Sequence, residues 1–337
     1  PRIVLFVSNI TVLIVLLIIG KASIDVYFRI IFIGAFLNLV INYLLAIKMG
    51  FKYVPTLKLA DPDTQKLIAL FAPTLLSCGV FKIHTLIDTM ITTNIGTGSL
   101  TILTYSSQVS GMISNFVIAN MLTIAYPQII RGVETENKQK ELWKYAISFQ
   151  AIICLLVCGF IAIGENGINL LYVKGEFTAK SGHILYMGAL MYLAAQILLI
   201  IRDLIFRFFY AMENTKDTVS NSIISCVFNI IMSLILVKPL GMYGVILGTF
   251  ISGAISMVMI LFRMKKLYGL EKFGLNLFEL IKNIIVLVIS VFAIILIKKH
   301  IIIENDVMAI LIYGVLTVII FVILAIIFKL KAIKIKL

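Results

Sequence analysis

Long, continuous runs of apolar residues recur along the whole chain, and they decide what it can fold into. An α-helix needs about 20 such residues to cross the hydrocarbon core of a bilayer. Ten runs of roughly that length can be marked, at 3–19, 26–47, 67–95, 100–130, 145–163, 184–210, 219–237, 242–262, 278–297 and 307–328. We therefore expect an all-α, polytopic membrane protein with about ten transmembrane helices.

The composition excludes the soluble classes of protein. Apolar residues make up 61% of the 337 residues and charged residues only 13%, about half the charged share of a soluble domain. A soluble enzyme, a disordered chain and a nucleic-acid-binding protein are therefore not expected. The four cysteines all lie within apolar runs, where they are interpreted as small buried side chains and not as disulfide partners.

The basic residues predict how the chain is oriented in the membrane. With ten spans, the connecting loops alternate between the two sides, and most of the 29 Lys and Arg residues fall on one of them. This set includes Lys58, Lys138 and Lys266. By the positive-inside rule that side is cytoplasmic, so both ends of the chain are expected there. The net charge of +13 then reflects topology and requires no nucleic acid.

The loops offer no candidate catalytic centre. They are short, and they carry no cluster of acids and histidines, no metal-ligand spacing and no glycine-rich phosphate-binding motif. We therefore expect a transporter and not an enzyme, with no cofactor and no metal. The chain begins at Pro1, and its first apolar run starts at once, so we expect its natural beginning to be missing.

The third apolar run contains three ionisable residues, Lys82, His84 and Asp88. Charges at such a depth are costly and normally face a protein interior or a water-filled cavity. His84 and Asp88 are four residues apart and can pair on one helical face, whereas Lys82 points elsewhere. Two interpretations stay open: a tether between helices, or a cavity-lining group that binds substrate or couples transport.

Two other groups are interpreted as structural. In the sixth run, Arg202 precedes Asp203, and Asp203 and Arg207 have the spacing of a favourable helical ion pair at the cytoplasmic interface. In the eighth run, Gly244 and Gly248 form a small-xxx-small pattern, which is typical of close helix packing.

Three stretches make the chain resemble the MurJ/MviN lipid II flippases of the multidrug/oligosaccharidyl-lipid/polysaccharide exporter superfamily. Residues 70–109 are similar to the family's seventh and eighth helices, with a Pro near the start and an Asp-Thr pair at Asp88. LLYVKGEFTAKS (170–181) is similar to an outer loop of the family. RFFYAMENTKDT (207–218) and 226–252 resemble its Arg-x-Phe-Tyr-Ala turn and its Pro-Leu-Gly-x-x-Gly hairpin.

The resemblance implies a two-lobe helical bundle of the kind found in this superfamily, which includes the MATE exporters. The family has fourteen helices, so this chain would hold helices five to fourteen, with an incomplete N-terminal lobe. Residues 1–48 would be the last two helices of that lobe, 49–66 a cytoplasmic linker, 67–264 a six-helix C-terminal lobe, and 265–337 two additional helices and a basic tail. The additional helices would flank a groove for the lipid tail.

The chain departs from the family pattern at two positions. The eighth helix of the family carries a cavity-facing Arg where this chain has Gln108, and NTKDT (214–218) lacks the Pro of the family's turn. A lipid-linked oligosaccharide other than lipid II therefore stays open as the substrate. We expect Lys82 to face the central cavity and to supply the charge that the eighth helix lacks.

The function that these features predict is translocation of an undecaprenyl-diphosphate-linked cell-wall precursor across the bacterial plasma membrane by alternating access. The partners would be this polyprenyl-diphosphate-linked saccharide and membrane lipids, and we expect a monomer. A coupling ion or the membrane potential would supply the driving force. Two alternatives stay open: a MATE-like cation-coupled exporter of small organic molecules, and a membrane enzyme of cell-envelope polysaccharide assembly.

Overall fold

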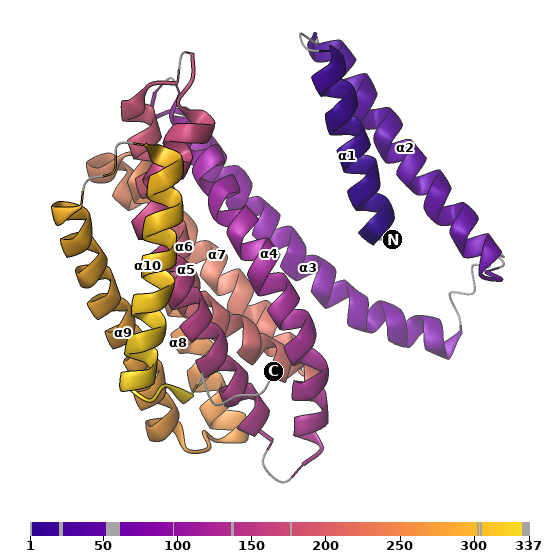
Figure 1. The fold of residues 1–337 in the computed structure, drawn as a ribbon. Coiled ribbons are helices and arrows are strands. Elements are labelled where there is room, and N and C mark those ends of the chain that lie inside the picture. Colours follow the sequence, from indigo (N-terminus) through magenta and orange to yellow (C-terminus); the bar gives the residue numbers. More distant parts are fainter. Residues whose placement is uncertain are drawn as a thin grey trace. The chain divides into compact units, whose positions relative to one another are not determined.

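All regular structure in the described part of the chain is helical. The computed structural model describes residues 2–19, 23–51, 61–96, 98–135, 138–175, 177–301, 303 and 305–331. Within these ranges it contains α1 (Arg2–Ile19), α2 (Ile24–Lys48), α3 (Pro62–Thr93), α4 (Ser99–Val133), α5 (Lys140–Tyr172), α6 (Ala179–Ala211), α7 (Thr215–Leu240), α8 (Met242–Tyr268), α9 (Phe273–His300) and α10 (Asp306–Ile327) (Figure 1).

These helices confirm the all-α fold expected from the apolar runs. Each run corresponds to one helix, and most helices extend several residues beyond their run. Eight of the described helices, α2 and α4–α10, are long and apolar enough to cross a membrane. Pro127 lies inside α4 without ending it, although a proline removes one backbone hydrogen bond from a helix. The protein is therefore a multi-pass membrane protein.

The chain divides into two compact units, residues 1–65 and 66–337. In the first unit, α1 and α2 form an antiparallel hairpin (Figure 1). The Ser8 hydroxyl joins the two helices by donating to the Gly34 carbonyl at 2.9 Å. At the start of α2, Ser23 caps the helix by accepting a hydrogen bond from the Val26 amide.

The core of the second unit is built around α5 and α6. About two thirds of the membrane-spanning window of α5 is buried, and half of that of α6. Large side chains such as Phe149, Phe208 and Phe209 are fully buried there. The ring of Tyr268, at the end of α8, meets Phe208 and Phe209 edge to face with centroids 5.5 Å apart, a favourable aromatic geometry. α8 is thereby fixed against α6.

α9 and α10 lie side by side and both pack against α5 (Figure 1). Asn283 of α9 is fully buried and donates to the Ile147 carbonyl at 2.9 Å and to Gln150 Oε1 at 3.1 Å. Side-chain amides are common hydrogen-bonding links between membrane helices, where water cannot compete for them. α9 is thus held to α5 by specific contacts as well as by apolar packing.

Small residues allow α7 and α8 to pack in close contact. A Cβ added to Gly248 would lie 2.8 Å from the backbone nitrogen of Ser233, and one added to Gly244 would overlap the backbone of Leu236. Asn221 of α7 donates to the Ser256 carbonyl of α8 at 3.0 Å. Gly244 and Gly248 thus both lie where the backbones of α7 and α8 come into contact.

Candidate functional site

A buried carboxylate, Asp88, joins three helices of the second unit. Asp88 lies on α3 and is only 6% exposed. It accepts hydrogen bonds from the Ser233 hydroxyl of α7 at 3.0 Å and from the Thr249 hydroxyl of α8 at 3.4 Å. On its own helix, His84 Nε2 lies 3.3 Å from Asp88 Oδ2. The His84–Asp88 pair expected from the spacing is thus formed.

Asn229 of α7 completes the surroundings of this carboxylate. Its side-chain amide forms hydrogen bonds with its neighbours when the nitrogen faces Asp88 Oδ1, at 3.3 Å, and the oxygen faces Thr249. The oxygen then accepts from the backbone nitrogen of Thr249, at 3.2 Å. A carboxylate taken out of water needs such donors, because burying the charge without them costs on the order of several kcal/mol.

A polar cavity opens next to this network, between α3, α6, α7 and α8. Its volume is about 400 Å³. Most of its lining side chains carry hydroxyls, amides or charged groups. The lining residues are Lys82, His84, Leu199, Arg202, Asp203, Phe206, Ser222, Ser225, Cys226, Asn229, Thr249, Ser252, Gly253 and Ser256. His84, Asn229 and Thr249 line the cavity and also contact Asp88. They therefore connect the cavity with the buried carboxylate.

The charges on the cavity wall come from α3 and α6. Arg202 donates from Nη2 and Nε to Asp203 Oδ1, at 2.8 and 3.0 Å. The prediction of an Asp203–Arg207 ion pair is wrong. Arg207 Nη1 donates to the backbone carbonyl of Asp203, and the Asp203 carboxylate pairs with Arg202 instead. Lys82 forms no salt bridge with any described carboxylate. Its ammonium can therefore meet a ligand.

The structure brings together residues that the sequence analysis treated separately. Lys82 and His84 of the third run share one cavity with Arg202 and Asp203, which had been assigned to an interfacial anchor. Gln108 is exposed on α4 and does not line this cavity. The cavity that Lys82 lines lies within the second unit.

The polar residues of α7 and α8 were missed in the sequence. Ser222, Ser225 and Asn229 follow one another at spacings of three and four along α7, and Thr249, Ser252 and Ser256 do the same along α8. Such spacing places the side chains on one face of a helix. A polar face within an apolar span is a detectable signal of a lined cavity.

No described group of three or more His, Cys, Asp or Glu side chains could hold a metal ion. Cys154 and Cys158 are both buried in α5. The cations, hydroxyls and amides that line the cavity can bind anions and sugars by charge and hydrogen bonding.

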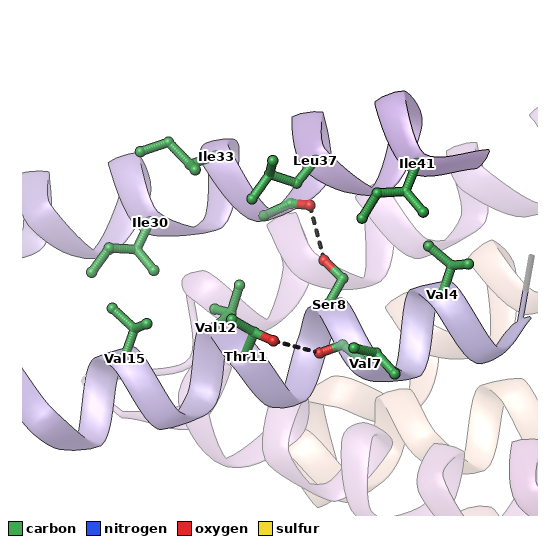
Figure 2. A pocket seen from close by; sticks show the side chains of 11 residues that line it. Val4, Val7, Ser8, Thr11, Val12, Val15, Ile30, Ile33, Leu37 and Ile41 are labelled. Atoms are coloured by element: carbon green, nitrogen blue, oxygen red, sulfur yellow. Dashed lines mark hydrogen bonds between the residues drawn. The ribbon is translucent and has the colours of Figure 1, made fainter. Parts of the chain in front are cut away.

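A second cavity, between α1 and α2, has a different character (Figure 2). Its volume is about 380 Å³. Branched aliphatic side chains from both helices line it, and among its described lining residues the polar side chains are those of Ser8 and Thr11, which donate to backbone carbonyls. Figure 2 shows Ile30 and Ile33 of α2 opposite Val12 and Val15 of α1. This cavity suits hydrocarbon and offers nothing to a charged headgroup.

Comparison with known proteins links the chain to one family. The family model described as lipid II flippase MurJ matches residues 4–330. A probable lipid II flippase MurJ of Thermotoga maritima is 25% identical over 244 residues, which cover 71% of this chain and 49% of that protein. One of Helicobacter pylori (strain J99) is 26% identical over 237 residues, or 67% of this chain and 50% of that protein.

The fold is also similar to a solved one. The structure described as "Lipid II flippase MurJ, inward closed conformation" superposes with a TM-score of 0.75 at 22% sequence identity. The match covers 98% of this chain and 67% of that chain. The chain spans about half the length of the curated relatives that it matches.

Proposed function

The chain belongs to the lipid II flippase MurJ family, and from this premise we propose that it works in translocating a polyprenyl-diphosphate-linked saccharide across the bacterial plasma membrane. The family is one of transporters, and this chain is a multi-pass membrane protein with at least eight apolar spans. The substrate would be lipid II or a related lipid-linked oligosaccharide, moved by a monomer without covalent chemistry.

The observation that supports this proposal most is the polar cavity beside Lys82 and Arg202. A diphosphate headgroup carries about two negative charges and cannot enter hydrocarbon unless cations and donors replace its water. Lys82 offers an ammonium, and Arg202 a planar guanidinium, which can bind two phosphate oxygens at once. The hydroxyls of α7 and α8 can hydrogen-bond sugar or phosphate oxygens.

The lipid tail would stay in the bilayer while the headgroup crosses. α9 and α10 present large exposed apolar side chains, among them Phe292 and Val315, and we assign the tail to this part of the chain. Residues 1–48 would be the last part of the N-terminal lobe, and residues 49–66 would link the two lobes. Residues 67–264 would form the C-terminal lobe, and residues 265–337 would form an extension that binds the lipid tail. Alternating access of the two lobes would expose the headgroup to each side in turn.

The proposed orientation follows from the distribution of basic residues. The loops that contain Lys138 and Lys266 would face the cytoplasm, as would both ends of the chain. A substrate assembled in the cytoplasm would then reach the cavity from that side. A coupling ion or the membrane potential would drive the cycle.

Flipping of fluorescent lipid II in liposomes tests the proposal, with the full-length protein as the carrier. Lys82→Gln should abolish flipping, because the neutral amide cannot offset the diphosphate charge, whereas Lys82→Arg should retain part of it. Lys174→Gln, which removes an exposed lysine of the α5–α6 connection, is the matched control and should flip normally. All variants should keep the melting temperature of the unmodified protein.

Two outcomes would contradict the proposal. Normal flipping by Lys82→Gln would exclude the cavity as the headgroup site. Consumption of the labelled lipid, by polymerisation or cleavage, would identify a membrane enzyme of envelope assembly instead.

A further inference from the structure

The α1–α2 hairpin holds a third cavity, and this one is partly polar. Its volume is about 500 Å³. The described residues that line it are Ser8, Asn9, Val12, Leu13, Tyr27, Ile31, Gly34, Ala35 and Asn38. Three of them, Ser8, Val12 and Gly34, also line the apolar cavity of Figure 2. The two cavities therefore adjoin along the contact between the helices, and the hairpin has one apolar and one partly polar side.

Side-chain amides from both helices gather on the polar side. The Ser8 hydroxyl bonds to the Gly34 carbonyl and so fixes which residues of α1 and α2 face each other. Asn9 is next to Ser8 in α1, and Asn38 is one turn after Gly34 in α2. The two amides thus lie at the same level of the hairpin, in the wall of one cavity.

A neighbouring residue fixes the orientation of the Asn38 amide. Asn42, one turn further along α2, donates from Nδ2 to the side-chain oxygen of Asn38 at 2.9 Å. The oxygen of Asn38 is therefore occupied, and turning its amide over would bring two donors face to face. Asn38 Nδ2 itself is buried and has no hydrogen-bond partner among the described residues. Buried donors of this kind are rare, and an acceptor in the cavity would satisfy this one.

The charge of the cavity limits what it can bind. None of the nine described residues that line it is charged. A diphosphate would find no cation there and an organic cation no acid, and an unpaired charge is strongly disfavoured in such surroundings. A neutral ligand with hydroxyl and carbonyl oxygens can accept from the amides without this penalty.

An aromatic ring lies toward the other end of the same wall. Tyr27 is 45% exposed and lines the cavity together with Asn38. The two residues are eleven positions apart on α2, which places them about 16 Å apart along the helix. A tyrosine ring offers an apolar plane with a hydroxyl at its edge. Amide donors at one end and a ring at the other suit a saccharide, whose rings have apolar C–H faces and polar edges.

We propose that this cavity of the first unit binds the neutral saccharide part of the substrate. Asn9 and Asn38 donate to hydroxyl or acetamido oxygens, and the Tyr27 ring packs on a sugar face. Asn42 is a positioning residue, which acts through Asn38. The inference rests on the proposed function for the class of substrate, and it adds the residues that recognise the sugar.

Saturation-transfer NMR on the purified full-length protein in lipid nanodiscs tests the proposal without a transport assay. The probe is N,N′-diacetylchitobiose, a neutral disaccharide with two acetamido groups, and no sugar-based detergent is present. Its ring and acetyl protons should receive saturation from the protein. Inorganic diphosphate at the same concentration should not displace it. Displacement would mean that sugar and phosphate compete for one charged site, and it would overturn the proposal.

The variants assign the binding to the polar side of the hairpin. Asn38→Leu nearly keeps the size of the side chain but removes the donor, and it should weaken disaccharide binding about tenfold. Asn120→Leu makes the same change at an exposed asparagine of α4, which donates to the Phe116 carbonyl. Thr11→Val changes the apolar side of the hairpin. Both controls should bind the disaccharide as the unmodified protein does.

Two more variants keep the proposal falsifiable. Should Asn38→Leu fail to fold, Asn9→Leu serves in its place, because Asn9 is exposed and its replacement disturbs no packing. It should weaken binding severalfold. Asn42→Leu leaves the Asn38 donor in place and removes the bond that orients it. It should weaken binding about threefold, less than Asn38→Leu.

Each remaining outcome decides the question. No saturation of the disaccharide would overturn the inference, as would equal binding by Asn38→Leu and Asn120→Leu. A lower melting temperature of Asn38→Leu, with no disaccharide binding by the unmodified protein, would make Asn38 a link to another helix. Asn38-dependent sugar binding without flipping of lipid II would contradict the proposed function and leave the sugar site standing. Flipping that depends on Lys82, with no sugar binding, would do the reverse.

Discussion

The Ser233 hydroxyl of α7 donates a 3.0 Å hydrogen bond to the Asp88 carboxylate of α3, although the two residues are 145 positions apart in the chain. The bond is fully buried and ties α3 to the closely packed α7–α8 pair. Asp88 thus holds α3 against the α7–α8 pair.

Ser233→Ala should lower the thermal stability of the purified protein. The change removes one donor from a buried carboxylate, and hydrogen bonds between membrane helices are worth about 0.6–1.7 kcal/mol. We expect a loss in the upper part of that range, because the acceptor is charged. The melting temperature, followed by the loss of monomeric protein in size-exclusion chromatography, measures it.

Ser225→Ala is the control for this substitution. Ser225 lies on the same helix, but its hydroxyl donates over 3.3 Å to a helical carbonyl, that of Ser252, and not to a charge. It should lose less stability than Ser233→Ala. Equal losses would show that the Ser233–Asp88 bond is not an important link between the helices.

The helices could be predicted from the sequence because their signal is local. Each continuous apolar run gives one helix, and the structure adds turns at the ends where polar residues reach the interface. α5, for example, begins at Lys140 and ends at Tyr172, well outside the apolar run at 145–163. The His84–Asp88 pair could be foreseen for the same reason, since four residues along one helix fix its geometry.

Which helices share the cavity could not be predicted, because this depends on contacts between segments far apart in the chain. Nothing local indicates that Asn229 and Thr249 meet Asp88, or that Lys82 of α3 shares a wall with Arg202 of α6. Even the local ion pair was assigned to the wrong partner. A spacing of four allows Asp203 to reach Arg207, but the rotamers around the cavity turn the Asp203 carboxylate to its neighbour Arg202.

Gly248→Ala should destabilise the α7–α8 pair. The added Cβ would lie 2.8 Å from the backbone nitrogen of Ser233, and a backbone atom within a helix cannot move aside alone. Overpacking of this kind costs about 1–3 kcal/mol. The melting temperature and the yield of monomeric protein would both fall.

Gly159→Ala provides the comparison for Gly248→Ala. Gly159 is in α5, and a Cβ there meets nothing within 4 Å. Replacing a helical glycine by alanine gains about 1 kcal/mol in helix propensity when space is free. The two alanine substitutions should therefore have opposite signs. A stable Gly248→Ala protein would mean that the two helices are farther apart than described.

Labelling of single cysteines in intact cells should show Lys138 and Lys266 on the cytoplasmic side. The argument is the excess of Lys and Arg in their loops. Lys138→Cys and Lys266→Cys should resist a membrane-impermeant maleimide added from outside and react after the cells are opened, whereas Lys174→Cys should react at once. Lys58, which belongs to the same basic set, lies outside the described residues. External labelling of Lys138→Cys would show that the bundle has the opposite orientation.

Asp203→Asn should increase the affinity of the cavity for a dianion. In the present arrangement the Asp203 carboxylate neutralises part of the Arg202 charge at 2.8 Å. Both side chains are partly exposed, so the gain is limited by solvent screening to about threefold to tenfold. Calorimetry with methanedisulfonate, a dianion with the shape of a diphosphate, measures the affinity at low and at physiological salt, and the gain should shrink as salt is added.

Two further variants determine whether the charge acts from the cavity wall. Arg202→Gln should shift the dianion affinity in the opposite direction to Asp203→Asn. Glu141→Gln should leave it unchanged, because Glu141 pairs with Lys144 in the first turns of α5, away from the cavity. An equal increase in Asp203→Asn and Glu141→Gln would reflect only the net charge of the protein. An unchanged affinity in Asp203→Asn and Arg202→Gln would mean that the anion binds elsewhere and that Lys82 does not work together with α6.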